Sequence, residues 1–138
     1  MKHKISTSWK GGMVFETDLM GYKLVMDAPP EAGGQNQGTR PKPLMIASLA
    51  GCTGMDVISI LKKMRVEVEE LSIHIEGDLT EEPPKHYTKM HIVYEFAGKD
   101  LPMDKLQKAV DLSREKYCGV SYVYGKVMEM EFEIKVRD

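Results

Sequence analysis

Two cysteines, Cys52 and Cys118, are the residues of this 138-residue chain best suited to chemistry. In peroxide reduction one thiolate attacks the O–O bond and becomes a sulfenic acid, which a second thiol captures as a disulfide before further oxidation. Two cysteines are the minimum set for that cycle. They lie 66 positions apart and neither belongs to a CxxC or CxxH pair, so we expect no metal.

Two glycines, Gly51 and Gly54, flank Cys52 in a segment with a helical pattern. Each costs about 1 kcal/mol relative to alanine in a helix, which indicates that something approaches the backbone closely there. Close helix packing explains the glycines equally well. In that interpretation Cys52 is only a small buried hydrophobic residue.

A nucleophilic cysteine needs a lowered pKa, and few cations lie near Cys52 in the sequence. The thiol is expected about ten residues into a helix, where the helix dipole has little effect. Arg40 and Lys42 are the nearest cations, and they reach Cys52 only if a loop folds back or a partner subunit supplies them. Asp56 would raise the pKa of the thiol if its charge were unpaired, or it is a buried carboxylate with a backbone or basic partner.

The histidines and methionines add no further site. The four histidines, His3, His74, His86 and His91, fall on strand positions or near turns, and none is beside a cysteine. His74 and His91 could meet across two antiparallel strands, but two imidazoles alone make a weak metal site. The eleven methionines are expected to pack in the core.

The elements that position the cysteines follow from hydrophobic patterning. The predicted segments are a three-stranded meander over residues 1–27, a loop rich in proline and glycine over 28–41, a central helix over 42–65, and strands, a second helix and a last strand over 68–138. The second helix begins near Leu101 and delivers Cys118 near its end. With no βαβ spacing, the expected fold class is α+β, mainly antiparallel, in one domain. The thin first sheet favours an intertwined homodimer.

Composition excludes several classes of protein. A hydrophobic content of 42% excludes disorder for most of the chain, and a net charge of -2 argues against nucleic-acid binding. The longest stretch without a charge, residues 43–55, is too short to span a bilayer. The N-terminal MKHKISTSWKGG has no apolar region typical of a secretory signal, so a cytoplasmic location is expected.

Three segments of the chain resemble the pattern of the family of osmotically inducible protein C (OsmC) and organic hydroperoxide resistance (Ohr) proteins. These segments are DAPPEAGGQNQGTRP, PLMIASLAGCTGMDV and SREKYCGVSYVYG. The resemblance covers nearly the whole chain. It implies antiparallel sheets around a long buried central helix, in a swapped homodimer with active sites at the subunit interface. It also implies that Cys52 is the peroxidatic nucleophile and Cys118 the resolving thiol. Organic hydroperoxides would be the substrate and thiols such as dihydrolipoyl groups the reductant, without a cofactor.

The chain departs from the peroxidase branches of that family at one point. Those branches carry an arginine in the N-terminal strand region and a glutamate near the start of the central helix, whereas residues 10–13 and 40–43 hold no such pair. The chain therefore resembles the OsmC-like branch, and we hypothesise that Arg40 supplies the cation. We predict a thiol-dependent peroxidase for organic hydroperoxides. The alternatives are a redox sensor or small-molecule-binding protein without peroxide turnover, and a purely structural dimer with buried thiols.

Overall fold

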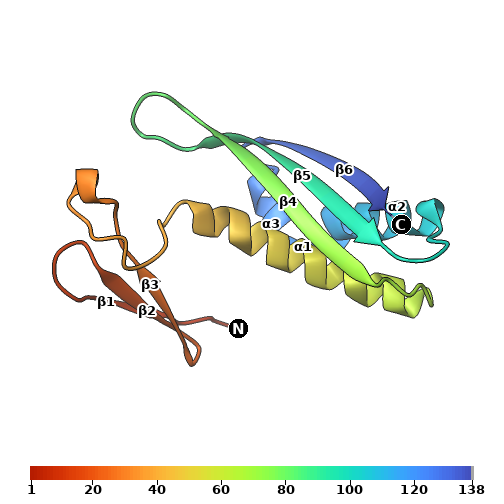
Figure 1. Ribbon diagram of the computed structural model, residues 1–138, viewed down its shortest axis with the longest axis horizontal. Coiled ribbons are helices and arrows are strands. Elements are labelled where there is room, and N and C mark those ends of the chain that lie inside the picture. Colours follow the sequence, from red (N-terminus) through yellow and green to blue (C-terminus); the bar gives the residue numbers. More distant parts are fainter. Residues whose placement is uncertain (138) are drawn as a thin grey trace. The chain divides into compact units, whose positions relative to one another are not determined.

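The computed structural model describes residues 1–137 of the chain, which form two compact units (Figure 1). The first unit is Met1–Met45 and the second begins at Ile46. Each unit contains one three-stranded sheet. The expected class of mixed α+β fold with a long central helix is therefore confirmed.

The N-terminal unit is an antiparallel meander followed by an ordered loop. Its elements are β1 (Ser6–Trp9), β2 (Phe15–Leu19), β3 (Tyr22–Met26) and a short 3₁₀ helix, η1 (Pro30–Ala32). Met20 and Gly21, between β2 and β3, both have positive φ angles, as a tight two-residue hairpin turn requires.

The long loop after β3 is organised around one buried carboxylate. Asp27 accepts backbone hydrogen bonds from Ala28 at 2.7 Å, Gln35 at 3.1 Å and Gln37 at 3.0 Å. These donors, with Gln37 the strongest, hold the pKa of Asp27 below its ordinary value. A side chain at Gly34 would meet the Ala28 carbonyl at 1.9 Å, so the loop also needs glycine there. The loop is therefore closed on itself.

The C-terminal unit packs helices against a mixed sheet. In chain order the elements are α1 (Pro43–Lys63), whose first turn belongs to the N-terminal unit, β4 (Glu70–Leu79), β5 (Tyr87–Ala97), α2 (Met103–Leu112), a π-helical turn η2 (Ser113–Tyr117), α3 (Gly119–Tyr124) and β6 (Glu129–Arg137). The strand order is β4-β5-β6. The core joins side chains of α1, β5 and α2, and its largest fully buried members include Tyr94, Phe96, Leu49, Leu61 and Leu106.

Helix α1 supplies a buried row to this core. Leu49, Thr53, Val57 and Leu61 recur at four-residue spacing and are buried. A side chain at Gly54 would meet Ile73 of β4 at 3.0 Å, so close packing explains that glycine. By length and apolar composition α1 could also cross a membrane, a test that the core helix of a folded domain passes as well. Its buried row assigns it to the core of the C-terminal unit.

One expectation about the second half of the chain was wrong and another was confirmed. Strand β6 pairs in parallel with β5, so β5, the helices after it and β6 form a βαβ crossover that the sequence did not indicate. The alternation of β6 fixes its buried face but not its direction. The predicted second helix is confirmed, because α2 and the π-helical turn η2 follow one another without a break from Met103 to Tyr117 and place Cys118 directly after their last residue.

Candidate active site

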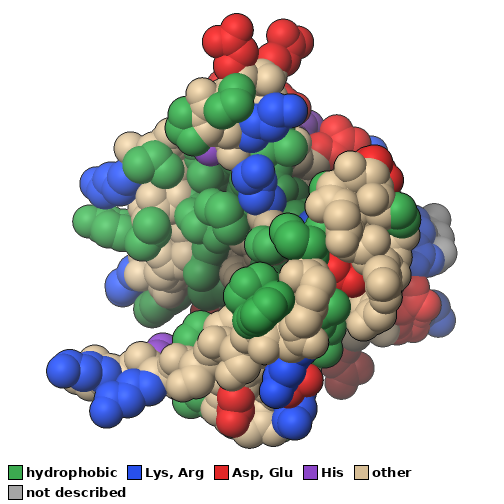
Figure 2. All heavy atoms as spheres, turned by 90° about the vertical axis from the view of Figure 1, so that its left-hand side faces the viewer, with side chains coloured by type: hydrophobic (Ala, Val, Ile, Leu, Met, Phe, Trp, Pro, Cys, Tyr) green, Lys and Arg blue, Asp and Glu red, His purple; other side chains and the backbone are tan. Residues whose placement is uncertain are grey.

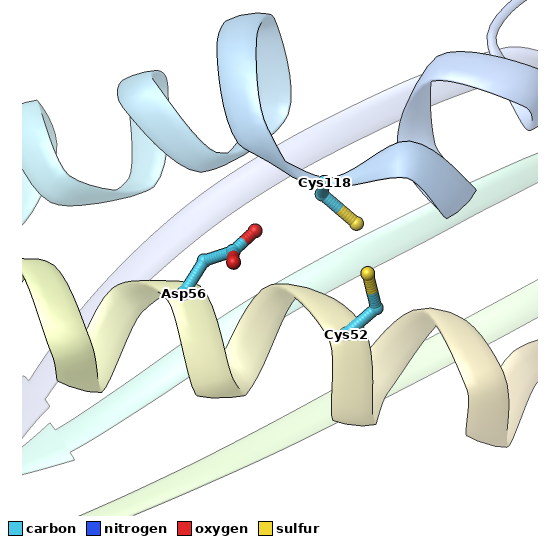
Figure 3. A group of neighbouring side chains, drawn as sticks. All are labelled: Cys52, Asp56 and Cys118. Atoms are coloured by element: carbon cyan, nitrogen blue, oxygen red, sulfur yellow. The ribbon is translucent and has the colours of Figure 1, made fainter. Parts of the chain in front are cut away.

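The structure brings the two cysteines together. Cys52 lies on α1 and Cys118 lies just before α3, and their sulfur atoms and a carboxylate oxygen of Asp56 are all within 4.8 Å of one another (Figure 3). Both thiols are free; Cys118 is 2% exposed, whereas Cys52 is partly exposed. Residues remote in sequence thus form one cluster with a side open to solvent.

The π-helical turn determines where Cys118 points. The N–H of Cys118 donates to the carbonyl of Ser113, five residues earlier, at 2.7 Å. Cys118 then caps α3, and its Sγ accepts the N–H of Ser121 at 3.3 Å. The neighbouring N–H of Val120 interacts with Cys52. Backbone N–H groups of one short segment therefore interact with both sulfur atoms.

The surroundings of Cys52 do not favour its thiolate. Burial is the largest influence and raises the pKa of Cys52, and the neighbouring Cys118 and the charge of Asp56 raise it further. The N–H of Val120 acts in the opposite direction. None of these influences is a cation. A thiolate at neutral pH therefore needs a positive charge from another part of the chain or from a partner.

A chain of buried hydroxyl groups ends on Asp56. The Ser113 hydroxyl donates to Asp56 Oδ2 at 3.1 Å. Ser113 Oγ also lies 2.8 Å from Thr53 Oγ1, which in turn lies 2.6 Å from the Tyr94 hydroxyl. Since Ser113 has a single proton and gives it to Asp56, Thr53 must donate to Ser113 and Tyr94 to Thr53. All three hydroxyls thus donate in the direction of the carboxylate.

The chain of hydroxyl groups also shows which group is hydrogen-bonded to Asp56. Within residues 1–137 no ion pair involves Asp56, and it accepts a hydrogen bond from the Ser113 hydroxyl rather than from a basic group. Burial raises the pKa of Tyr94 to about 12, so its phenol stays protonated and can donate. Sequence reasoning missed Tyr94, Thr53 and Ser113 as a network, because each occupies an ordinary core position of its element.

Arg40 belongs to the N-terminal unit. Its guanidinium donates to the Gly38 carbonyl at 3.3 Å and to the Asn36 side chain, and its charge helps to lower the pKa of Asp27. It also lines a cavity of about 440 Å³ whose other walls are mainly apolar, including Met13, Phe15, Met26, Pro29 and Pro41. A role of Arg40 toward Cys52 stays a prediction.

The histidines of the second sheet lie outside the cysteine cluster. His74 is 3.3 Å from Glu95, and His91 is 3.0 Å from Glu133. These exposed pairs lie on the polar face of β4, β5 and β6, which agrees with the expectation of a solvated strand face.

Removing the middle of the hydroxyl chain is expected to destabilise the fold. Ser113→Ala leaves buried Thr53 without an acceptor and Asp56 without a donor, which should cost about 1–3 kcal/mol of unfolding free energy. Urea denaturation measures the change, with Ser8→Ala on the exposed strand β1 as control. Equal stabilities of the two variants would show that the network contributes nothing.

Removing the charge of Asp56 is expected to increase the reactivity of Cys52. Because that charge raises the pKa of the thiol, Asp56→Asn should lower the pKa and speed alkylation by iodoacetamide at pH 7 by a few-fold. The measurement is the alkylation rate of Cys52 as a function of pH in the presence of EDTA. If the midpoint of this pH profile stayed in place or moved to higher pH, the charge of Asp56 would not be what raises the pKa of Cys52.

Comparison with known proteins agrees with this fold. The family model for OsmC-like proteins matches residues 34–133, a range that includes both cysteines. The chain therefore belongs to the OsmC-like family, which confirms the resemblance found in the sequence.

Similar proteins match almost the whole chain. Protein YhfA of Escherichia coli K12 is 28% identical over 129 residues, which are 93% of this chain and 93% of YhfA. A hypothetical protein from Aquifex aeolicus VF5 has a TM-score of 0.88 at 28% identity, with 99% of this chain and 97% of that chain covered. The organic hydroperoxide resistance protein OhrB of Bacillus subtilis has a TM-score of 0.69 at 22% identity over 98% of both chains, and shares the fold.

Proposed function

We propose that this protein is a thiol-dependent peroxidase that reduces organic hydroperoxides. The observation that carries the proposal is the proximity of the Cys52 and Cys118 sulfur atoms. Membership of the OsmC-like family supports it, as does the fold shared with a protein named for organic hydroperoxide resistance.

The proposed cycle uses both thiols and an external dithiol. The Cys52 thiolate attacks the distal peroxide oxygen, which breaks the O–O bond, leaves Cys52 as a sulfenic acid and releases an alkoxide that takes a proton to become the alcohol. The Cys118 sulfur then attacks the Cys52 sulfenic sulfur, which forms a disulfide and releases water. A dithiol such as a dihydrolipoyl group reduces that disulfide and is itself oxidised. Partial exposure of Cys52 gives hydroperoxides access.

The proposed active form is a homodimer. Hydrophobic side chains lie at the surface in several places (Figure 2). On α1 the exposed ones include Met55 at 77% and Ile58 at 45%. These two residues line a groove of about 710 Å³ between α1 and β4, together with Leu71 and Ile73. An apolar groove of this kind on a helix is suited to a second copy of the chain.

The dimer would also bring the missing cation to the thiol, and Arg40 is our candidate. Its charge would lower the pKa of Cys52 and stabilise the leaving alkoxide. Arg40→Met is then expected to raise the pKa of Cys52 and to reduce kcat/KM for organic hydroperoxides by about 10- to 100-fold. The alkylation pH profile and peroxide kinetics measure both effects. An unchanged pKa of Cys52 would remove Arg40 from the mechanism.

The test of function is whether peroxide consumption is catalytic. With excess dithiothreitol and cumene hydroperoxide, the peroxidase should consume many equivalents of peroxide per chain. The second candidate, a redox sensor without turnover, is favoured by the raised pKa of Cys52 and by the absence of the Arg–Glu pair of the peroxidase branches. A sensor whose oxidised form is not returned to the thiol in this assay would consume one equivalent and then add nothing to the rate with dithiothreitol alone. That result would replace the peroxidase proposal.

A further inference from the structure

We propose that Cys52, Asp56 and Cys118 also form a binding site for a divalent metal ion that prefers thiolate ligands, of which zinc is the representative. The site lies at the cysteine cluster of Figure 3, where two sulfur atoms and a carboxylate oxygen converge from α1 and the start of α3. This inference is independent of peroxide turnover, since it needs only the reduced thiols.

The three donors have the spacing that such an ion requires. Tetrahedral zinc bonds sulfur at about 2.3 Å and carboxylate oxygen at about 2.1 Å, so its ligand atoms lie about 3.6–3.8 Å from one another. The ligand atoms of Cys52, Asp56 and Cys118 are within 4.8 Å of one another. Side-chain movements of about 1 Å would therefore bring them to the spacing of a zinc site. A water molecule would take the fourth position, on the side where Cys52 is exposed.

The charges of the cluster favour a cation at its centre. Asp56 accepts a hydrogen bond from a directed chain of hydroxyls, and no ion pair within the described part of the chain neutralises it. With both thiols ionised the cluster would carry three negative charges. A divalent ion offsets two of them, whereas the protonated thiols leave the carboxylate uncompensated.

The groups around the ligands also match those of metal sites. Ligating carboxylates and thiolates in metal centres receive outer hydrogen bonds that orient them. Here Ser113 donates to Asp56, the Ser121 N–H donates to Cys118 Sγ, and the Val120 N–H interacts with Cys52. These hydrogen bonds hold the three ligands in place before an ion binds.

The binding reaction is balanced without oxidation or reduction. One zinc ion replaces the protons of two thiols, so two zinc–sulfur bonds form and about two protons are released. The disulfide form has no thiolate to offer and does not bind the ion. Bound zinc would thereby protect Cys52 from peroxide until the zinc ion dissociates.

Cobalt chloride is the probe that tests the site, because cobalt substitutes for zinc and reports its ligands by colour. The reduced, metal-free full-length protein should bind one cobalt ion with a thiolate-to-cobalt charge-transfer band, tetrahedral visible bands and proton release, and zinc should displace it. Cys118→Ser should lose about half of the charge-transfer intensity. Asp56→Asn should weaken cobalt binding by about 10- to 100-fold, whereas the exposed control Asp104→Asn should not.

The contrary results are equally specific. Absence of a thiolate band in reduced wild type, or the same cobalt affinity in Asp56→Asn as in Asp104→Asn, would overturn the site. Wild type oxidised to the disulfide provides a comparison without substitution, and it should show no band. A cobalt spectrum in a protein that lacks peroxide turnover would contradict only the peroxidase proposal.

Discussion

Replacing Cys52 with serine is expected to abolish the reduction of cumene hydroperoxide. A hydroxyl in this position is far less ionised than a thiol and has no sulfur to form a sulfenic acid, so kcat/KM should fall by at least about 1000-fold. The measurement is peroxide consumption with dithiothreitol as reductant, for wild type and variant at equal concentration.

Two controls separate this result from unfolding or from background chemistry. Circular dichroism and urea denaturation of Cys52→Ser should match those of wild type, because the side chain is only partly buried. The rate with dithiothreitol alone gives the uncatalysed background. Consumption by Cys52→Ser at the wild-type rate would show that Cys52 is not the nucleophile.

Replacing Cys118 with serine is expected to separate the first oxidation from the rest of the cycle. Cys52 can still attack the peroxide, but its sulfenic acid has no thiol within 4.8 Å to capture it. Without added reductant, labelling of Cys52 by dimedone should rise at least about tenfold over wild type, and further peroxide should convert Cys52 to sulfinic acid. Mass spectrometry of the peptide that contains Cys52 measures both products.

The wild type provides the reference for this second prediction. Its sulfenic acid should be short-lived, because Cys118 closes the disulfide, and dimedone should label little of it. Equal labelling of wild type and Cys118→Ser would mean that Cys118 does not resolve the sulfenic acid. The proximity of the two sulfur atoms would then serve the metal site alone.

Periodicity allowed much of the fold to be predicted. The central helix expected over residues 42–65 is α1, Pro43–Lys63, because apolar residues crowd that segment and Pro43 marks its start. The alternation near the C-terminus correctly indicated β6. The direction of β6 could not be read from patterning, because it depends on hydrogen bonds to β5, a remote segment.

Only the reactive residues of the site could be predicted from the sequence. Cys52 and Cys118 stood out by residue type, but their proximity depends on the π-helical turn that precedes Cys118. The hydroxyl chain to Asp56 was hidden because Tyr94 and Thr53 look like core residues of a strand and a helix. Arg40 was chosen by nearness in sequence, and its own unit shows it bound to loop groups.

The central claim, that Cys52 and Cys118 form one redox pair, is tested most directly by mapping disulfides in the wild type after one equivalent of cumene hydroperoxide. We predict a single intramolecular Cys52–Cys118 disulfide in nearly every chain. Because this bond closes a loop of 66 residues, it should stabilise the oxidised form by about 4 kcal/mol in the loop-entropy model. Two free thiols after treatment, or disulfides only between chains, would contradict the account.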